Sequence, residues 1–180
     1  MRYLNLMSVG LLLYSGLGHA HDALDDANAN LIASHGNMLK SNVMELELPE
    51  LEGNRILRLS DYAAKPMVLN FWGSYCPPCV AEMPMLHKQA LRYPGVQFLG
   101  IAVDDRLKAH GFLQSQQVTY PHIVAPIQSD GIMRRFGDKS GALPYTVILD
   151  DKHRICLSKA GGIDANWLAD SLRRCAPSNI

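Results

Sequence analysis

The sequence lacks an excess of charge of either sign, because 17 lysines and arginines balance 17 aspartates and glutamates. Proteins that bind nucleic acid through its phosphates ordinarily carry a strongly basic surface. The formal net charge of zero therefore argues against a nucleic acid as a partner. With 48% hydrophobic and 19% charged residues, the chain can still bury an ordinary core. We find no internal repeat.

Cysteine is scarce, with four residues among 180, and only Cys76 and Cys79 form a CxxC pair. A structural zinc site would need two further Cys or His ligands at similar spacing. Neither Cys156 nor Cys175 belongs to a second CxxC, so we predict no metal site. Thiol chemistry at the pair would need no cofactor.

The apolar run at the N-terminus, residues 6–17, is well short of the roughly 20 residues that a membrane span needs. It follows Arg2 and ends at Gly18-His19-Ala20, which completes the three parts of a secretory signal. We expect residues 1–20 to be a signal peptide cleaved after Ala20. An uncleaved N-terminal membrane anchor is the alternative. No cysteine stands at the cleavage position, which argues against a lipoprotein.

Export would place all four cysteines where disulfides persist, which in a bacterium means the periplasm or the outer face of the membrane. Residues 21–42 are polar and hold few large apolar side chains. Such composition is typical of disordered segments, so we expect a disordered leader there. The folded domain is then predicted to span residues 43–180.

The chemistry is expected in residues 71–79, an apolar run that ends in Cys76-Pro77-Pro78-Cys79. The preceding residues 67–72 have the pattern of a buried strand, and residues 80–83 are strong helix formers, so a helix should begin at the motif. Cys76 would lie at the N-cap, where free backbone N–H groups and the helix dipole stabilise a thiolate. Cys79 would lie one turn further on the same face.

This placement predicts that Cys76 is exposed and attacks a substrate disulfide, and that Cys79 resolves the resulting mixed disulfide. Two other uses of the pair are a structural disulfide and half of a zinc or copper site.

The rest of the chain alternates between strand-like and helix-like segments. Residues 43–48 and 56–59 should form a hairpin across a Gly53-Asn54 turn, and the helix after the CxxC should run to about Tyr93. Further strands are expected at residues 96–103, 121–125, 143–149 and 154–159, and further helices at 106–117, 131–136 and 166–174. This order predicts an α/β fold with a central mixed sheet flanked by helices.

Cys156 and Cys175 are predicted to be able to meet. The strand advances about 17 Å from Cys156 to Gly161 at ~3.3 Å per residue. The helix from Asn166 to Cys175 returns about 14 Å at ~1.5 Å per residue. We expect a structural disulfide between them, with two buried free thiols as the main alternative and a second redox relay as a weaker one.

With these elements placed, residues 44–175 resemble the thioredoxin fold and, more closely, the TlpA/ResA-type exported thiol-disulfide oxidoreductases. The resemblance rests on the N-terminal hairpin, on residues 68–72 running into the CxxC, on Glu82 and Pro84, and on Ala142-Leu143-Pro144 before a strand. It implies a thioredoxin-like domain with an N-terminal β-hairpin extension.

The resemblance also implies roles for residues around the pair. Pro144 is expected to be a cis-proline beside the CxxC, and the backbone of Leu143 to pair with an extended substrate. Glu82 is expected to transfer the proton of Cys79, because Asn70 stands where thioredoxins carry a buried acid; a solvated surface glutamate is the alternative. Trp72 is expected to pack under the active site and to take part in substrate binding, although a purely core role is equally open.

Two residues depart from the family pattern. Tyr75 precedes Cys76 where relatives usually have tryptophan, and Tyr145 follows Pro144 where threonine is common. Both are expected to flank the substrate approach. Substrate choice and redox potential therefore do not carry over from the family.

The resemblance implies a periplasmic reductase of oxidised protein thiols, of the cytochrome c maturation or copper-site assembly type. A membrane electron donor would reduce it again, and we expect a monomer. A thiol oxidase would share the same residues, since direction depends on the relative stability of dithiol and disulfide. The alternatives outside this chemistry are a Cu(I)-binding chaperone that uses both thiolates and, less well supported, a peroxiredoxin.

Overall fold

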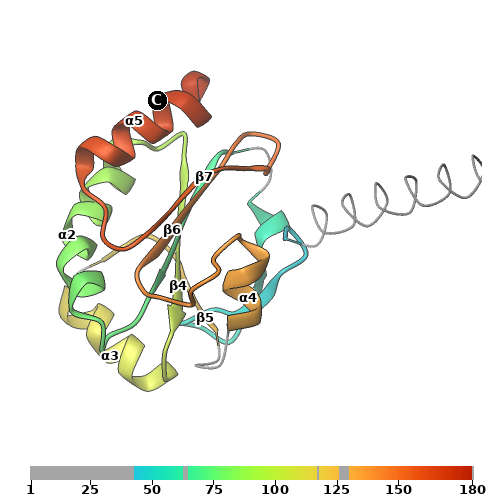
Figure 1. The fold of residues 1–180 in the computed structure, drawn as a ribbon. Helices are drawn as coiled ribbons and strands as arrows, with labels where there is room; N and C mark the ends of the chain where they lie inside the picture. The colour runs from blue at the N-terminus through green and yellow to red at the C-terminus, as the bar shows by residue number, and fades with distance from the viewer. Residues whose placement is uncertain (1–42, 63–64, 117, 126–129, 180) are drawn as a thin grey trace, which may run out of the picture. The chain divides into compact units, whose positions relative to one another are not determined.

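The computed structural model describes residues 43–62, 65–116, 118–125 and 130–179 (Figure 1). The expected signal peptide and leader, residues 1–20 and 21–42, lie outside the described residues. Within the described ranges, no helix is both long enough and apolar enough to cross a bilayer.

Five strands form a mixed sheet in the spatial order β5-β4-β3-β6-β7. The central strand β3 (Met67–Trp72) pairs in parallel with β4 (Gln97–Val103) and antiparallel with β6 (Tyr145–Leu149). β5 (His122–Ala125) adds a parallel edge strand and β7 (Ile155–Ala160) an antiparallel one. Every residue of β3 is buried, which is expected for a strand covered on both faces. The predicted mixed α/β sheet is confirmed.

Three helices cover one face of this sheet: α2 (Pro77–Arg92), α3 (Arg106–Gln116) and α5 (Ala165–Cys175). α2 and α5 pack against each other on this face (Figure 1). Their buried side chains meet Val68 and Trp72 of β3. A short 3-10 helix, Pro177–Asn179, follows α5.

The opposite face is covered by α4 (Asp130–Arg135) and by the N-terminal hairpin of β1 (Glu47–Pro49) and β2 (Ile56–Arg58). Leu69 and Phe71 of β3 point to this second core. The two cores are separate because successive side chains of a strand point to opposite faces.

The hairpin is joined to the edge of the sheet, where the Leu51 N–H donates to the His122 carbonyl at 2.9 Å. The predicted first strand, residues 43–48, is too long. Residues 43–45 form a turn instead, in which Leu46 N–H donates to Val43 O at 3.3 Å. A further 3-10 helix, Leu59–Asp61, follows β2.

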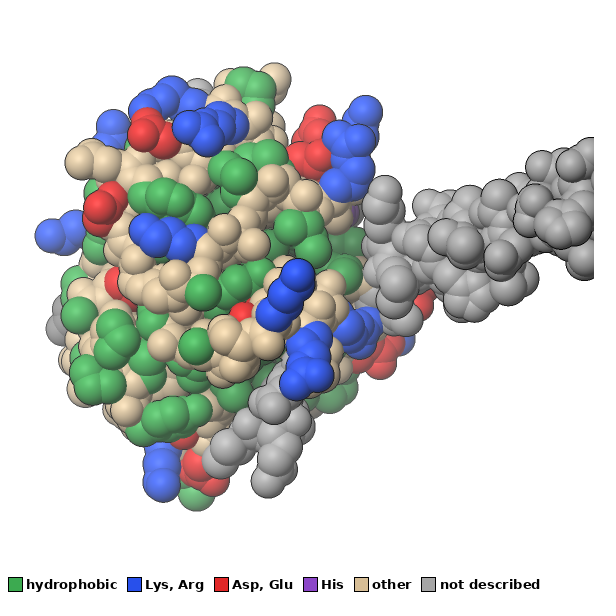
Figure 2. Space-filling view, in the orientation of Figure 1, with side chains coloured by type: hydrophobic (Ala, Val, Ile, Leu, Met, Phe, Trp, Pro, Cys, Tyr) green, Lys and Arg blue, Asp and Glu red, His purple; other side chains and the backbone are tan. Residues whose placement is uncertain are grey.

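Figure 2 shows basic side chains near α5 and α4, with acidic side chains among them. The last turns of these helices carry Arg173 and Arg174 in α5 and Arg134 and Arg135 in α4. The charge of this face is therefore mixed, in keeping with the balanced composition.

Candidate active site

β3 leads directly into the CxxC pair, and Cys76 is the N-cap of α2. Pro77 and Pro78 occupy the first two helical positions, where a backbone N–H has no partner within the helix. The Cys79 N–H donates to Cys76 Sγ at 3.4 Å. The two sulfurs form a disulfide with a Cα–Cα distance of 5.3 Å.

The two cysteines differ in exposure, though less than the sequence predicted. Cys79 is fully buried, whereas Cys76 keeps 7% of its surface exposed. The expectation of an exposed Cys76 is therefore too strong, because its sulfur is bonded to Cys79 Sγ and also accepts the Cys79 N–H. Cys76 remains the more accessible of the two.

Glu82 lies one turn after Cys79 and is 5% exposed. Its Oε1 accepts a hydrogen bond from Asn70 Nδ2 at 2.8 Å, and its Oε2 accepts one from Ile163 N–H at 2.9 Å. Burial raises the pKa of the Glu82 carboxyl, while these hydrogen bonds and the positive charge of Lys159 oppose the rise. The alternative of a solvated surface glutamate is wrong.

Asn70 extends this network to β6. Its Nδ2 also donates to Thr146 Oγ1 at 3.1 Å, and the two residues are paired across β3 and β6. Thr146 was not recognised from the sequence as part of the site. The available signal was one polar residue, Asn70, inside an otherwise apolar strand.

The peptide bond between Leu143 and Pro144 is cis. The last registered pair of β3 and β6 is Phe71 with Tyr145, so Pro144 follows on beside Trp72, just before the CxxC loop. The Pro144 carbonyl accepts a hydrogen bond from Gly161 N–H at 2.8 Å. Leu143 is half-buried. The sheet register therefore brings Leu143 and Pro144 next to the segment that carries the cysteines.

Trp72 is fully buried, so its indole lies beneath the site and has no surface to offer a substrate. Its Nε1–H donates to His122 Nδ1 at 3.1 Å. A substrate-binding residue would need an exposed surface, so the prediction that Trp72 binds the substrate is wrong. Trp72 is a core residue beneath the site. For its partner His122, the sequence predicts only a place in the strand at residues 121–125.

Tyr75 is 61% exposed beside Cys76, and its hydroxyl donates to the Val103 carbonyl at 3.2 Å. The loop is also held by Asp104, whose Oδ2 accepts Ser74 N–H at 2.6 Å. The Tyr145 side chain is 3% exposed and belongs to the opposite core, so the expectation that it flanks the substrate approach is wrong.

Cys156 and Cys175 form a second disulfide. The register of β6 and β7 skips one residue, since Ile148 pairs with Leu157 but Leu149 pairs with Ile155. Cys156 is the extra residue of this β-bulge, which removes it from the regular alternation of the strand. Its sulfur reaches Cys175 in the last turn of α5.

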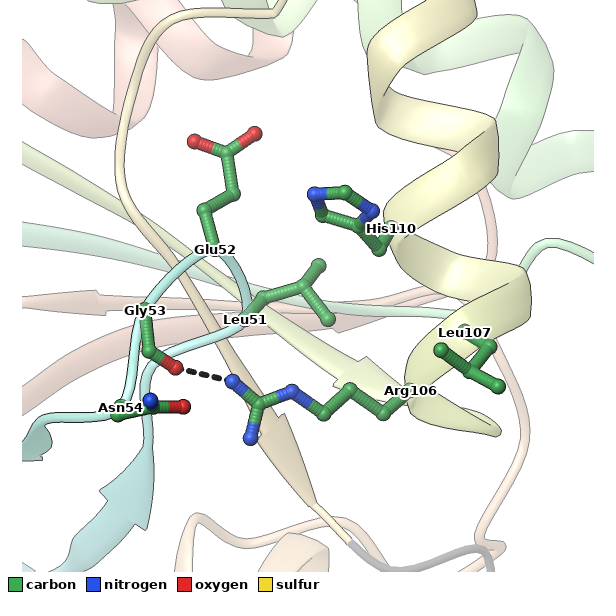
Figure 3. A pocket seen from close by; sticks show the side chains of 7 residues that line it. All are labelled: Leu51, Glu52, Gly53, Asn54, Arg106, Leu107 and His110. Atoms are coloured by element: carbon green, nitrogen blue, oxygen red, sulfur yellow. Dashed lines mark hydrogen bonds between the residues drawn. The ribbon is translucent and has the colours of Figure 1, made fainter.

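A cavity of about 280 Å³ lies between the turn of the N-terminal hairpin and α3 (Figure 3). The Arg106 guanidinium crosses it and donates to the Gly53 carbonyl. Its other lining residues are Leu51, Glu52, Asn54, Leu107 and His110, so neither cysteine of the CxxC pair lines it. Within the described part of the chain, no three His, Cys, Asp or Glu side chains are grouped so that they could hold a metal.

Comparison with known proteins identifies the family. The AhpC/TSA family matches residues 39–157. The thiol-disulfide oxidoreductase ResA of Geobacillus thermodenitrificans is 30% identical over 148 residues, which cover 81% of this chain and 79% of that protein. ResA of Bacillus subtilis is 26% identical over 140 residues, covering 76% and 75%.

Solved structures agree with this relationship. The thioredoxin-related protein from Neisseria meningitidis serogroup B has a TM-score of 0.65 and 27% identity, covering 73% of this chain and 100% of that one. A secreted disulfide oxidoreductase from Mycobacterium tuberculosis has a TM-score of 0.62 at 21% identity, covering 73% and 96%, and shows the fold alone. This chain belongs to the AhpC/TSA family, within which it is a ResA-like thiol-disulfide oxidoreductase of thioredoxin fold.

Proposed function

We propose that the protein is a periplasmic reductase of protein disulfides, of the kind that serves cytochrome c maturation or copper-site assembly. One observation carries the proposal. The Cys76–Cys79 disulfide stands at the N-terminus of α2, and the buried, hydrogen-bonded carboxyl group of Glu82 lies one turn after Cys79. The family resemblance favours the reductive direction. A membrane electron donor would return the pair to the dithiol.

The reaction begins with the dithiol form. The Cys76 thiolate attacks one sulfur of the substrate disulfide, which forms a mixed disulfide and releases the first substrate thiol after that group takes up a proton. The Cys79 thiolate then attacks Cys76 Sγ, which breaks the mixed disulfide and releases the second substrate thiol. The substrate gains two electrons and two protons, and the protein is left as the Cys76–Cys79 disulfide.

Glu82 supplies the base that the second step needs. Cys79 is fully buried, and burial disfavours the thiolate, so its proton must be removed within the protein. Glu82 lies one turn further along α2, and burial raises the pKa of its carboxyl group toward neutral pH. A base whose pKa lies near the working pH transfers protons most effectively. Glu82 takes the proton from Cys79 before the thiolate attacks.

Leu143, Pro144 and Tyr75 guide the substrate in this proposal. The backbone of Leu143 pairs with an extended substrate segment, and cis-Pro144 holds that backbone beside the CxxC loop. Tyr75 offers an exposed ring next to Cys76. Trp72 supports the loop from beneath through its bond to His122.

The deciding experiment is the reduction potential of the Cys76–Cys79 pair. We would equilibrate the protein in thiol buffers and trap free thiols, using a Cys156→Ser/Cys175→Ala variant to remove the second pair from the count. A potential near or below that of thioredoxin, about −270 mV, is expected for a reductase. A potential near about −120 mV would instead identify a thiol oxidant.

A further inference from the structure

A row of residues crosses all five strands on the face covered by α2, α3 and α5. The registers pair Asn70 with Gly100 and with Thr146, Gly100 with His122, and Thr146 with Lys159. Paired residues of neighbouring strands lie on the same face of a sheet. The row therefore runs from the buried His122 on one edge strand to Lys159 on the other.

Glu82 is bonded to the middle of this row through Asn70, which also donates to Thr146. Lys159 on β7 is paired with Thr146 and ends the row on that side of the sheet. It is only half-buried, because β7 is an edge strand. The row thus connects the buried carboxyl to a cation that borders solvent.

The position of Lys159 is held by α5. Its Nζ lies 5.4 Å from the centre of the Trp167 ring, a cation–π contact. Trp167 N–H in turn donates to Asp164 Oδ1, the N-cap of this helix, at 2.8 Å. The neighbouring Ile163 N–H donates to Glu82. One segment, residues 163–167, therefore contacts the carboxylate and also fixes the ammonium group.

Three buried titratable groups on the helix-covered side of the sheet, Tyr120, His122 and Cys79, carry no charge at neutral pH. The Tyr120 hydroxyl is buried and donates to Met83 Sδ at 3.0 Å, and burial raises its pKa further. Burial lowers the pKa of His122 to about 3, so its imidazole is neutral. Cys79 is in the disulfide. Lys159 is the charged residue of the row, and its positive charge lowers the pKa of the Glu82 carboxyl.

We propose that Lys159 is a positioning residue for the resolving step: its ammonium group, held over Trp167, favours the carboxylate form of Glu82 and so keeps a base ready for the Cys79 proton. This inference rests on the proposed function of Glu82. When Glu82 accepts the proton of Cys79, the thiolate attacks Cys76 Sγ and expels the second substrate sulfur as a thiolate. That thiolate takes up a proton from water, and Glu82 releases its proton to solvent after the products separate.

The test follows the NMR chemical shift of the Glu82 carboxyl carbon as a function of pH in the oxidised protein. The Lys159→Met variant is compared with the protein of unchanged sequence. Loss of the nearby cation should move the titration midpoint of Glu82 upward by about half a pH unit or more. Trp167→Leu, which frees the ammonium group, should move the midpoint in the same direction by less. An unchanged midpoint in Lys159→Met would overturn the inference.

Lys152→Met is the matched control, because Lys152 lies in the exposed turn before β7 and is bonded there through its backbone N–H. It loses the same charge at a position outside the row, so the Glu82 midpoint should stay where it is. An equal shift in both variants would mean that overall charge, and not the position of Lys159, governs Glu82.

The reaction of the reduced protein with oxidised glutathione supplies the functional readout. The rate at which the mixed disulfide is resolved should rise with pH as Glu82 loses its proton, which gives the pH profile a rising limb. In Lys159→Met this limb should move to higher pH, and in Glu82→Gln it should disappear. If Glu82→Gln leaves the profile unchanged, the proton-transfer role of Glu82 fails. If Glu82→Gln removes the limb while Lys159→Met leaves it in place, only the role of Lys159 fails.

Discussion

At the scale of single residues, His122 joins the site to the stability of the core. Its Nδ1 accepts the Trp72 indole N–H, and its ring packs at a tilt against Tyr120, with the ring centres 4.5 Å apart. A Cβ at Gly100 would overlap Nδ1 of His122, so only glycine leaves room for the ring. The buried Nε2 has no hydrogen-bond partner among the described residues. Burial therefore keeps this imidazole neutral, and the absence of a side chain at Gly100 gives it room.

The first prediction concerns acid. Burial lowers the pKa of His122 from 6.5 to about 3, so the unfolded chain takes up a proton that the folded protein excludes. The contribution of His122 to stability is complete above about pH 6.5 and decreases as the pH falls toward 3. Between pH 7 and pH 4.5 we expect it to remove about 2.5 kcal/mol of the free energy of unfolding, measured by urea denaturation.

His122→Asn is the comparison, since the Asn oxygen replaces Nδ1 as acceptor and does not titrate in this range. The variant should be less stable at pH 7 but should lose less stability on acidification. If both proteins lose the same free energy between pH 7 and pH 4.5, the acid sensitivity lies elsewhere in the chain.

At the scale of elements, α5 serves the site although it carries no cysteine of the CxxC pair. Its N-cap, Asp164, follows Ile163, whose N–H binds Glu82, and its first turn carries Trp167. Leu168 and Leu172 are fully buried against the helix-covered face of the sheet. The beginning of α5 therefore combines a helix cap with support for the buried carboxyl.

We expect Asp164→Ala to remove the hydrogen bond to Trp167 N–H and to cost about 1 kcal/mol of stability, as N-cap losses usually do. Denaturant unfolding at neutral pH measures the loss. Asp164→Asn keeps an acceptor oxygen and should cost less. Equal stability of the Ala variant and the unchanged protein would show that the cap contributes little.

At the scale of the whole molecule, the Cys156–Cys175 disulfide joins the edge strand β7 to the end of α5 across 19 residues. The covalent loop restricts the unfolded chain and contributes on the order of 3 kcal/mol. A Cys156→Ser/Cys175→Ala variant should lose about this amount of unfolding free energy while its CxxC pair still reacts with oxidised glutathione.

Two results would contradict this structural role. A variant as stable as the unchanged protein would mean that the bridge adds nothing to the fold. A variant that stays folded but no longer turns over at the CxxC would mean that the second pair takes part in the redox cycle.

Much of the fold followed from local sequence patterns. The apolar residues 67–72, the prolines after Cys76 and the alternation in the hairpin each act within a few residues, so β3, the start of α2 and the pairing of β1 with β2 were predictable. The boundary of β1 was not, because residues 43–45 satisfy the strand pattern but close a turn.

The sequence alone determined that two cysteines would stand at the start of a helix after a buried strand, because propensity, capping and periodicity are local. Only the tertiary structure decided what surrounds them. Glu82 receives its hydrogen bonds from Asn70, 12 residues away, and Ile163, 81 residues away. The pairing of β6 with β3 placed Tyr145 in the opposite core, and a bulge between β6 and β7 freed Cys156 to reach Cys175. Such contacts depend on register and packing between distant segments, and no local pattern encodes these.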